Sequence, residues 1–261
     1  MEGPMPVAFT AHGNPMNALG GNPFARFLAR WGESLPRPQA VLCVSAHWER
    51  SPLAVTASER PETVHDFYGF PPELYRLRYP APGSPALAAR TRQLLVAAGF
   101  LCQEEQSRGL DHGVWSPLMH LLPGCDVPVV QLSLPRGVPP NAHVEIGRAL
   151  APLRKEGILI IGSGNLVHNL IAADLRDREA PVAAWALRFD GWVKQCLQEW
   201  NLEALSTPWE AGPAGRDAHP TLEHYAPLLV VCGAADPEPR VAFPFEGFEH
   251  GSLSMRCVQL S

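Results

Sequence analysis

Residues Ala40–Trp48 read AVLCVSAHW, a stretch that combines a buried strand with a candidate ligand. Val41–Val44 are four apolar residues in succession, which favours a strand covered on both faces, as in an α/β sheet. The run then ends on two small residues, Ser45 and Ala46, before His47. Imidazole is a common ligand of transition metals, so we interpret His47 as a metal ligand placed at the end of a core strand.

Continuous apolarity recurs along the chain at intervals typical of strands that alternate with helices. The further strand-like runs are Pro6–Thr10, Pro128–Leu134, Ile158–Gly162, Pro227–Gly233 and Arg256–Leu260, with Leu53–Ala57 as an expected edge strand. Helices are expected over Pro85–Ala98, Asn141–Gly157 with a break at Pro152, and Ala180–Trp200, followed by a long loop over Asn201–Pro220. This alternation predicts an α/β fold.

The composition is that of a compact globular chain. The 261 residues are 46% hydrophobic and 18% charged, and this length suits one large α/β domain. The net charge of -5 comes without any run of like charges, so nothing indicates a nucleic-acid partner or an anionic membrane. No apolar run approaches a bilayer span, and no signal peptide is evident. Six cysteines without a CxxC pair favour buried thiols in a cytoplasmic protein.

Three strand-like runs are each followed, after small residues, by one of the histidines His12, His47 and His168. Ligands in open α/β sheets bind beyond the carboxyl ends of the strands, so these imidazoles are expected to converge. Three protein ligands would leave coordination positions open for water or substrate. A lone histidine at a strand end is more often a hydrogen-bonded packing residue, so the metal site depends on the matching contexts of His12 and His47.

Two further stretches supply additional candidates. His219, Glu223 and His224 cluster before the run Pro227–Gly233, and one of them could complete the coordination. His112 lies between an acid and a glycine on an expected loop before a helix. Glu223 and His224 could equally form only the first turn of a helix, so the pattern leaves the choice open.

The other histidines are expected to lie in loops or to pack, and they are His65, His120, His143 and His250. The loop after His65 contains the aromatic residues Phe67, Tyr68, Phe70 and Tyr75. These rings could stack on an aromatic substrate or anchor the loop to the core, and the sequence favours neither.

The sequence lacks the loop motifs of serine hydrolases and of dinucleotide-binding proteins. The segment GSGN lacks the preceding glycine of a nucleophile elbow, and Val167 replaces the third glycine of a dinucleotide fingerprint.

Eight short motifs occur in order along nearly the whole chain, and they are AHGNPM, SAHWE, VHDFYGFPPELY, YPAPGSPALA, LDHGVWSPL, SGNLVHN, PTLEHYAPLL and GSLSMR. Together they resemble the class III extradiol ring-cleavage dioxygenases, and particularly the DOPA 4,5-dioxygenase-like branch of bacteria and plants. Each motif alone has little specificity, whereas the ordered series is specific. One departure is Asn14, where that branch more often has serine, and it concerns the pocket wall rather than metal binding.

The resemblance implies a single α/β catalytic domain over residues 1–261, with a mixed and mostly buried central sheet flanked by helices. It implies that His12, His47 and His224 are the metal ligands. Glu223 stays an alternative third ligand, because a glutamate completes the site in the protocatechuate branch of the family.

The resemblance also implies two further pocket histidines. His168 corresponds to the acid/base histidine of the family, and His112 corresponds to a histidine that contacts substrate or oxygen. An imidazole titrates near neutral pH when it is unperturbed, which suits it to take a proton and return it.

The activity implied by the resemblance is extradiol cleavage of DOPA or a related catechol by Fe(II) and O2. Zn(II) is a possible metal in the purified protein, and zinc cannot support this redox reaction. Partners other than catechol and O2 are not expected, and the protein is expected to be a monomer or a small homo-oligomer. The alternatives are a zinc-dependent hydrolase on the same scaffold and a non-enzymatic binding protein of the same superfamily.

Overall fold

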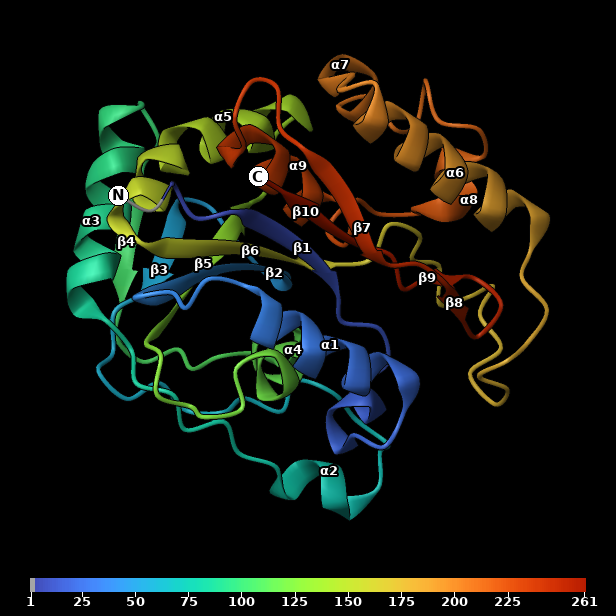
Figure 1. Cartoon of the computed structure of the whole chain (residues 1–261), viewed down its shortest axis with the longest axis horizontal. Coiled ribbons are helices and arrows are strands. Elements are labelled where there is room, and N and C mark those ends of the chain that lie inside the picture. The colour runs from blue at the N-terminus through green and yellow to red at the C-terminus, as the bar shows by residue number, and fades with distance from the viewer. Residues whose placement is uncertain (1–2) are drawn as a thin grey trace.

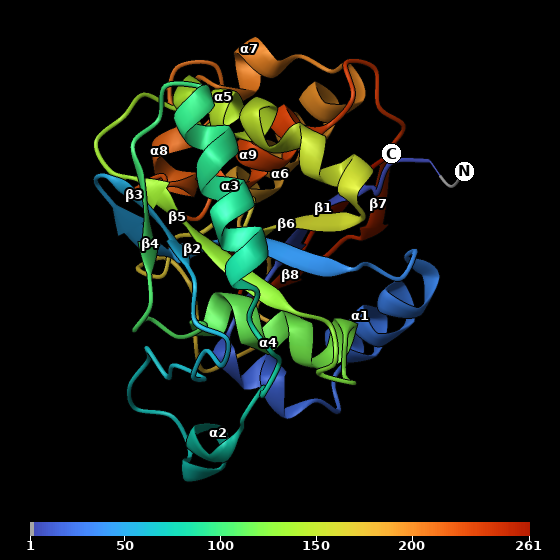
Figure 2. The same cartoon turned by 90° about the vertical axis from the view of Figure 1, so that its left-hand side faces the viewer.

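The computed structural model describes residues 3–261 and contains an eight-stranded sheet with helices on both faces (Figures 1 and 2). The strand order is β4-β3-β5-β2-β6-β1-β10-β7. The four central strands β5, β2, β6 and β1 are parallel. At one end β3 runs antiparallel to β5, and at the other end β10 and β7 add antiparallel pairs. This confirms the predicted α/β fold with a mixed central sheet.

The strands of the main sheet are β1 (Val7–Ala11), β2 (Ala40–Arg50), β3 (Leu53–Thr56), β4 (Cys102–Glu105), β5 (Val129–Pro135), β6 (Ile158–Gly164), β7 (Val241–Phe245) and β10 (Cys257–Leu260). A separate small hairpin consists of β8 (Phe248–Glu249) and β9 (Leu253–Ser254).

The α-helices are α1 (Pro23–Ser34), α2 (Pro72–Arg76), α3 (Pro85–Ala97), α4 (His112–Leu121), α5 (Asn141–Leu150), α6 (Ala184–Gln198), α7 (Leu202–Leu205), α8 (Gly215–Ala218) and α9 (Ala226–Ala234). Two 3-10 segments are η1 (Pro15–Leu19) and η2 (Ala151–Glu156).

The sheet separates two hydrophobic cores, which explains the continuous apolarity of its strands. On β6, Ile158 and Ile160 belong to the core that also contains buried residues of α3, α5, α6 and α9. Leu159 and Ile161 face the opposite way and join the core built with α1 and α4. Figure 1 shows these two helical layers above and below the sheet. Because successive strand side chains point to opposite faces, a strand covered on both sides must be apolar throughout.

One predicted strand was wrong. The run Pro227–Gly233 forms most of helix α9, which is buried along its whole length. A short run of apolar residues does not distinguish a strand from a fully buried helix. Pro227 lies in the first turn of α9, where proline is tolerated because a backbone N–H at that position would have no intrahelical partner.

Within residues 3–261, no helix combines the length and apolarity needed to cross a membrane.

Other boundaries also differ from the prediction. The segment Leu53–Ala57 was expected at the sheet edge, but β4 lies outside β3 and forms that edge. The helix expected over Ala180–Trp200 begins only at Ala184, and the expected loop over Asn201–Pro220 contains the one-turn helices α7 and α8. The break at Pro152 is confirmed, because α5 ends at Leu150 and a 3-10 turn follows.

Helices α5 and α9 are in backbone contact, and this gives a stability prediction. A Cβ atom on Gly147 would lie 2.1 Å from the carbonyl oxygen of Val230, so the helices would have to separate. We expect Gly147→Ala to lower the free energy of unfolding by about 3 kcal/mol. Gly191→Ala on α6 is the matched control, because nothing lies within 4 Å of its Cβ. Urea denaturation measures both, and equal stability of the two variants would contradict the prediction.

Candidate metal centre

The strands β1, β2 and β6 are adjacent and parallel, and β1 and β6 end level with one another, whereas β2 continues to Arg50. The expectation that this strand ends on Ser45 and Ala46 was therefore wrong, and His47 lies within β2. Ser163 of β6 pairs with Thr10 on one side and with Ser45 on the other. His12 and His47 each lie two residues beyond these partners, so both reach the same edge of the sheet. The pairing of β2 with β5 is interrupted around His47, and such irregularities redirect side chains.

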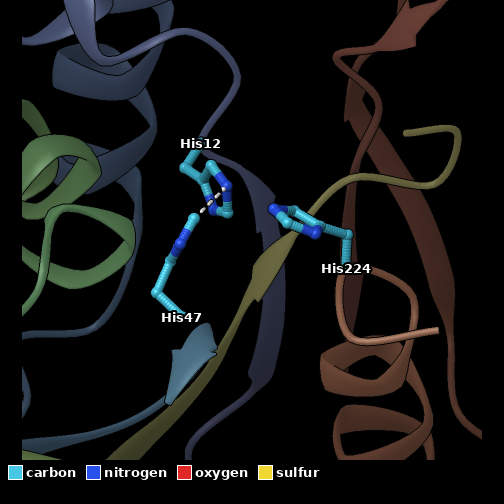
Figure 3. Close-up of side chains that lie close together, drawn as sticks. All are labelled: His12, His47 and His224. Atoms are coloured by element: carbon cyan, nitrogen blue, oxygen red, sulfur yellow. Dashed lines mark hydrogen bonds between the residues drawn. The ribbon is translucent and has the colours of Figure 1, made fainter. Parts of the chain in front are cut away.

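Three imidazoles meet at this edge, as Figure 3 shows. His47 Nε2 lies 3.1 Å from His12 Nε2, and one ring nitrogen from each of His12, His47 and His224 lies within 4.8 Å of the others. Two nitrogens that each bind one ion at about 2.1 Å lie roughly 3–3.5 Å apart. The cluster therefore has the dimensions of a shared metal site, assembled from segments near the two ends of the chain.

The hydrogen bond of His12 Nδ1 places the lone pair of this ring on Nε2, which lies within hydrogen-bond distance of His47 Nε2 and is available to a metal. Ser163 Oγ donates to the carbonyl oxygen of Gly113. A hydroxyl has a single hydrogen, so this oxygen accepts from His12 Nδ1, which is 3.1 Å away. The lone pair of the neutral ring is then on Nε2, the atom that faces His47. The sequence did not predict this role of Ser163, which lies in the segment GSGN.

His224 is oriented from the other side of the cluster. Its Nδ1 donates to Glu223 Oε1 at 3.0 Å, so its Nε2 carries the lone pair. The N–H of Asn165 donates to the carbonyl oxygen of His224 at 3.0 Å. A Cβ on Gly164 would lie 2.1 Å from that same oxygen, so glycine is required for this approach. The small residues at the end of β6 thus bring the start of α9 to the site.

Burial keeps the clustered imidazoles neutral. Burial lowers the pKa of His12 and His224 well below its usual value, and repulsion among the histidines lowers it further. For His47, burial and then repulsion from His112 lower the pKa to about 4, although nearby carboxylates raise it. The neutral ring is the form that binds a metal, so these donors are ready near neutral pH.

His112 is the first residue of α4 and is held by Asp66, a residue that sequence reasoning missed. Asp66 Oδ1 accepts from the backbone N–H of His112 at 3.0 Å and from its Nδ1 at 2.8 Å. Burial alone would raise the pKa of Asp66, but these hydrogen bonds lower it to about 2. The ring of His112 lies 4.0 Å from that of His47. The sequence signal for Asp66 was its place in the motif VHDFYGFPPELY.

His168 lies in the loop after β6 and stacks on His224, with ring centroids 3.4 Å apart and planes 6° apart. Its backbone N–H donates to the carbonyl oxygen of Ala218 at 3.0 Å, which ties this loop to α8. Burial, followed by the neighbouring His219, lowers the pKa of His168 to about 3. The structure therefore places a neutral imidazole directly beside the three-histidine cluster.

These five histidines line one cavity of about 210 Å³. Much of the remaining wall is apolar and includes Phe67, Phe70, Leu170, Leu175 and Leu253. Two rings of the aromatic loop thus reach the cavity, whereas Tyr68 is exposed to solvent. Asn14 also lies in the wall, and its side chain accepts from the N–H of Met16.

The other five histidines each donate a ring N–H to a backbone carbonyl oxygen. The pairs are His65–Leu77, His120–Asn17, His143–Pro140, His219–Leu166 and His250–Asp174, all at 2.9–3.1 Å. A carbonyl oxygen satisfies the imidazole N–H of each of these rings. Within residues 3–261, the groups of side chains that could share a metal do not include His219, so this candidate for completing the coordination lies outside the cluster.

Comparisons with known proteins agree with this geometry. A family model described as the catalytic LigB subunit of aromatic ring-opening dioxygenase matches residues 11–254. The chain is 41% identical to an uncharacterized protein of Escherichia coli K12 whose crystal structure superposes with a TM-score of 0.84, covering 98% of this chain and 100% of that one. The chain belongs to the LigB family of class III extradiol dioxygenases, and it is an extradiol ring-cleavage dioxygenase.

Within this family, the chain is similar to proteins named 4,5-DOPA dioxygenase extradiol. It is 45% identical over 259 residues to the protein of that name from Escherichia coli strain K12, covering 98% of this chain and 94% of the relative. It is 39% identical over 250 residues to the one from Beta vulgaris, covering 94% of this chain and 92% of the relative.

Proposed function

We propose that this protein is a non-haem Fe(II)-dependent dioxygenase that opens the ring of DOPA or a related catechol with O2. The observation that carries the proposal is the convergence of His12, His47 and His224 at the base of one cavity. The second ring nitrogens of His12 and His224 are already engaged by Ser163 and Glu223, so the free nitrogens face one point. The names of the relatives support a catechol as substrate.

We assign the third ligand position to His224 rather than to Glu223. Glu223 Oε1 accepts from His224 Nδ1 at 3.0 Å and from Thr221 Oγ1 at 3.0 Å, which is the arrangement of a carboxylate that orients a metal-binding histidine. Three neutral imidazoles suit iron and also zinc, so zinc is an expected occupant of the purified protein. A bound ferrous ion would supply open positions for the two catechol oxygens and the redox chemistry for O2.

His168 is placed to move a substrate proton. Its ring is neutral in the free protein and stacks on His224, so it lies next to any catechol held at the cluster. A neutral imidazole accepts the phenolic proton, and the anionic oxygen left on the substrate then stabilises the imidazolium. The same ring returns the proton when the product forms.

His112 is placed to hold the substrate or oxygen by a hydrogen bond. Its Nδ1 and backbone N–H both donate to Asp66, so the ring is fixed before any ligand binds. The rings of Phe67 and His112 lie nearly perpendicular to one another, with centroids 5.5 Å apart. A ring fixed in this way is pre-organised, which reduces the cost of aligning the reacting groups.

The test uses protein purified without oxygen and loaded with Fe(II). We expect O2 uptake and a yellow semialdehyde product when catechols, including DOPA, are supplied. The zinc-loaded protein is expected to be inactive, since zinc does not change its oxidation state. Turnover that needs zinc and no O2 would instead identify a hydrolase, and no turnover of any catechol by the iron-loaded protein would defeat the proposal.

The orienting role of Glu223 gives a binding prediction. We expect Glu223→Ala to weaken metal affinity by about 10- to 100-fold, because His224 loses the acceptor that fixes its ring. Glu223→Gln is the matched variant, since the amide oxygen still accepts from His224 Nδ1, and it should bind more tightly than the alanine variant. Competition with a chromophoric chelator measures both affinities. Equal affinities of the two variants would contradict an orienting role.

A further inference from the structure

A buried carboxylate to which no role has yet been assigned lies behind the proposed ligand His47. Asp111 is fully buried and directly precedes His112 at the start of α4. An aspartate at this position usually accepts from an N–H of the first helical turn, but within residues 3–261 the side chain of Asp111 makes no such bond. Instead, Ser45 Oγ donates to its Oδ1 at 2.8 Å, and Gln131 Nε2 donates to its Oδ2. The carboxylate therefore ties the start of α4 to β2 and β5.

A third donor connects Asp111 to the backbone of His47. Arg108 Nη2 donates to Asp111 Oδ2 at 3.2 Å and to the carbonyl oxygen of His47 at 3.4 Å. Its guanidinium also lies over the ring of Trp48, 4.8 Å from the centroid. The N–H of His47 donates to Ser45 Oγ at 3.2 Å. Both polar groups of the His47 backbone are thus held by side chains that Asp111 itself holds.

These contacts take the place of strand pairing around His47. The register of β2 with β6 ends at Ser45, and its register with β5 passes from Val44 to Glu49. Within residues 3–261, positions 46–48 therefore have no partner in either register. Buried backbone groups need hydrogen-bond partners from some source, and an interrupted ladder does not fix the direction of the chain. Side chains from outside the strand must therefore fix the backbone that carries this ligand.

We propose that Asp111 is a positioning residue that aligns His47 with the metal, acting through Ser45 and Arg108. This inference rests on the proposed metal-dependent function and adds to it a residue outside the three-histidine set. Groups that fix a metal ligand raise the affinity for the ion, because the ligand is already ordered before the ion binds. A carboxylate suits this role, since its two oxygens accept from several donors at once. Its loss should weaken metal binding even where the protein still folds.

The first experiment measures metal affinity instead of turnover, by competition of a chromophoric chelator with the zinc-loaded protein. Asp111→Asn keeps one acceptor oxygen and replaces the other by an amide NH2, which cannot accept from Arg108 or Gln131. We expect the affinity for Zn(II) to fall about 10-fold. Ser45→Ala removes only the hydroxyl between Asp111 and the N–H of His47, and it should lower the affinity to a similar extent. In the double variant the two losses should add only in part, because both substitutions break one connection.

The matched control is a second network of the same composition elsewhere in the fold. Asp190 on α6 is buried and accepts from Ser254 Oγ at 2.6 Å and from Arg256 Nε at 3.1 Å. Within residues 3–261, it belongs neither to the cavity wall nor to the groups of side chains that could share a metal. Asp190→Asn and Ser254→Ala make the same chemical changes. They should lower the free energy of unfolding, measured in urea, without changing the affinity for zinc.

The visible spectrum of the cobalt-loaded protein provides a second readout. Co(II) accepts the same kinds of ligand as Zn(II), and its absorption bands depend on the number and geometry of those ligands. We expect Asp111→Asn to change the positions of these bands in the metal-saturated protein. Asp190→Asn should leave them as in the wild type, since a loss of stability alone does not move a ligand.

The outcomes separate this inference from the proposed function. If Asp111→Asn keeps the wild-type zinc affinity and cobalt spectrum, the positioning role is overturned, whereas ring cleavage by the wild-type enzyme stands. If Asp190→Asn lowers the zinc affinity as much as Asp111→Asn, the effect is one of general stability and the role is also overturned. If Asp111→Asn does not fold, Ser45→Ala decides by the same two readouts. If the iron-loaded wild-type enzyme opens no catechol, the proposed function fails, and the zinc and cobalt results still decide the role of Asp111.

Discussion

Replacing His224 by alanine is expected to remove metal binding and to lower kcat/KM for catechols by at least about 1,000-fold, since a bound metal contributes several kcal/mol to catalysis. One ring nitrogen of His224 lies within 4.8 Å of those of His12 and His47. Removing it would leave only two of the three proposed ligands at the edge of the sheet. Metal content after reconstitution with Fe(II), measured beside O2 uptake, tests the expectation.

The control and the contradicting result follow from the neighbouring residues. His120→Ala makes the same substitution at a histidine that donates to the carbonyl oxygen of Asn17, and it should keep both metal and activity. If His224→Ala retained the metal while Glu223→Ala lost it, the third ligand would be Glu223. That outcome would place this chain with the two-histidine, one-carboxylate members of the family.

The convergence of the histidines could be predicted because it depends on strand topology. A buried parallel strand that ends in small residues places the next side chain at the carboxyl edge of the sheet. His12 follows this rule, since it comes directly after β1, whereas His47 lies within β2, which continues to Arg50. Both histidines nevertheless lie two residues beyond partners of Ser163. The apolar runs predicted the central strands for the same reason, because both faces of the sheet are covered.

The environment of each histidine could not be predicted in the same way. Single-sequence patterns do not show which imidazoles gather at one point, and His224 shares a group with His12 and His47 that does not include His219. Asp66 lies 46 positions from the ring that it orients, so no local spacing links the two. The helix α9 was mistaken for a strand because it is apolar on every side. Only the resemblance to a family placed His224 in the ligand set beforehand.

Replacing His168 by glutamine is expected to lower kcat for catechol cleavage by about 100- to 10,000-fold, the usual contribution of a positioned acid or base. Glutamine fills a similar space but does not accept and return a proton at neutral pH. His168 stacks on His224 and is not one of the three histidines assigned to the metal, so the variant should bind Fe(II) with wild-type affinity. Loss of activity with retained metal distinguishes proton transfer from ligand loss.

The pH dependence of this variant provides the sharper test. With His168 absent, the substrate must lose its phenolic proton to solvent, so kcat/KM should rise with pH more steeply than in the wild-type enzyme. The wild-type imidazole is already neutral near pH 7, because burial lowers its pKa to about 3, so its own deprotonation does not limit the rate. A glutamine variant whose pH profile parallels that of the wild type would show that His168 has a structural role, and the proton would then have to pass through His112 or water.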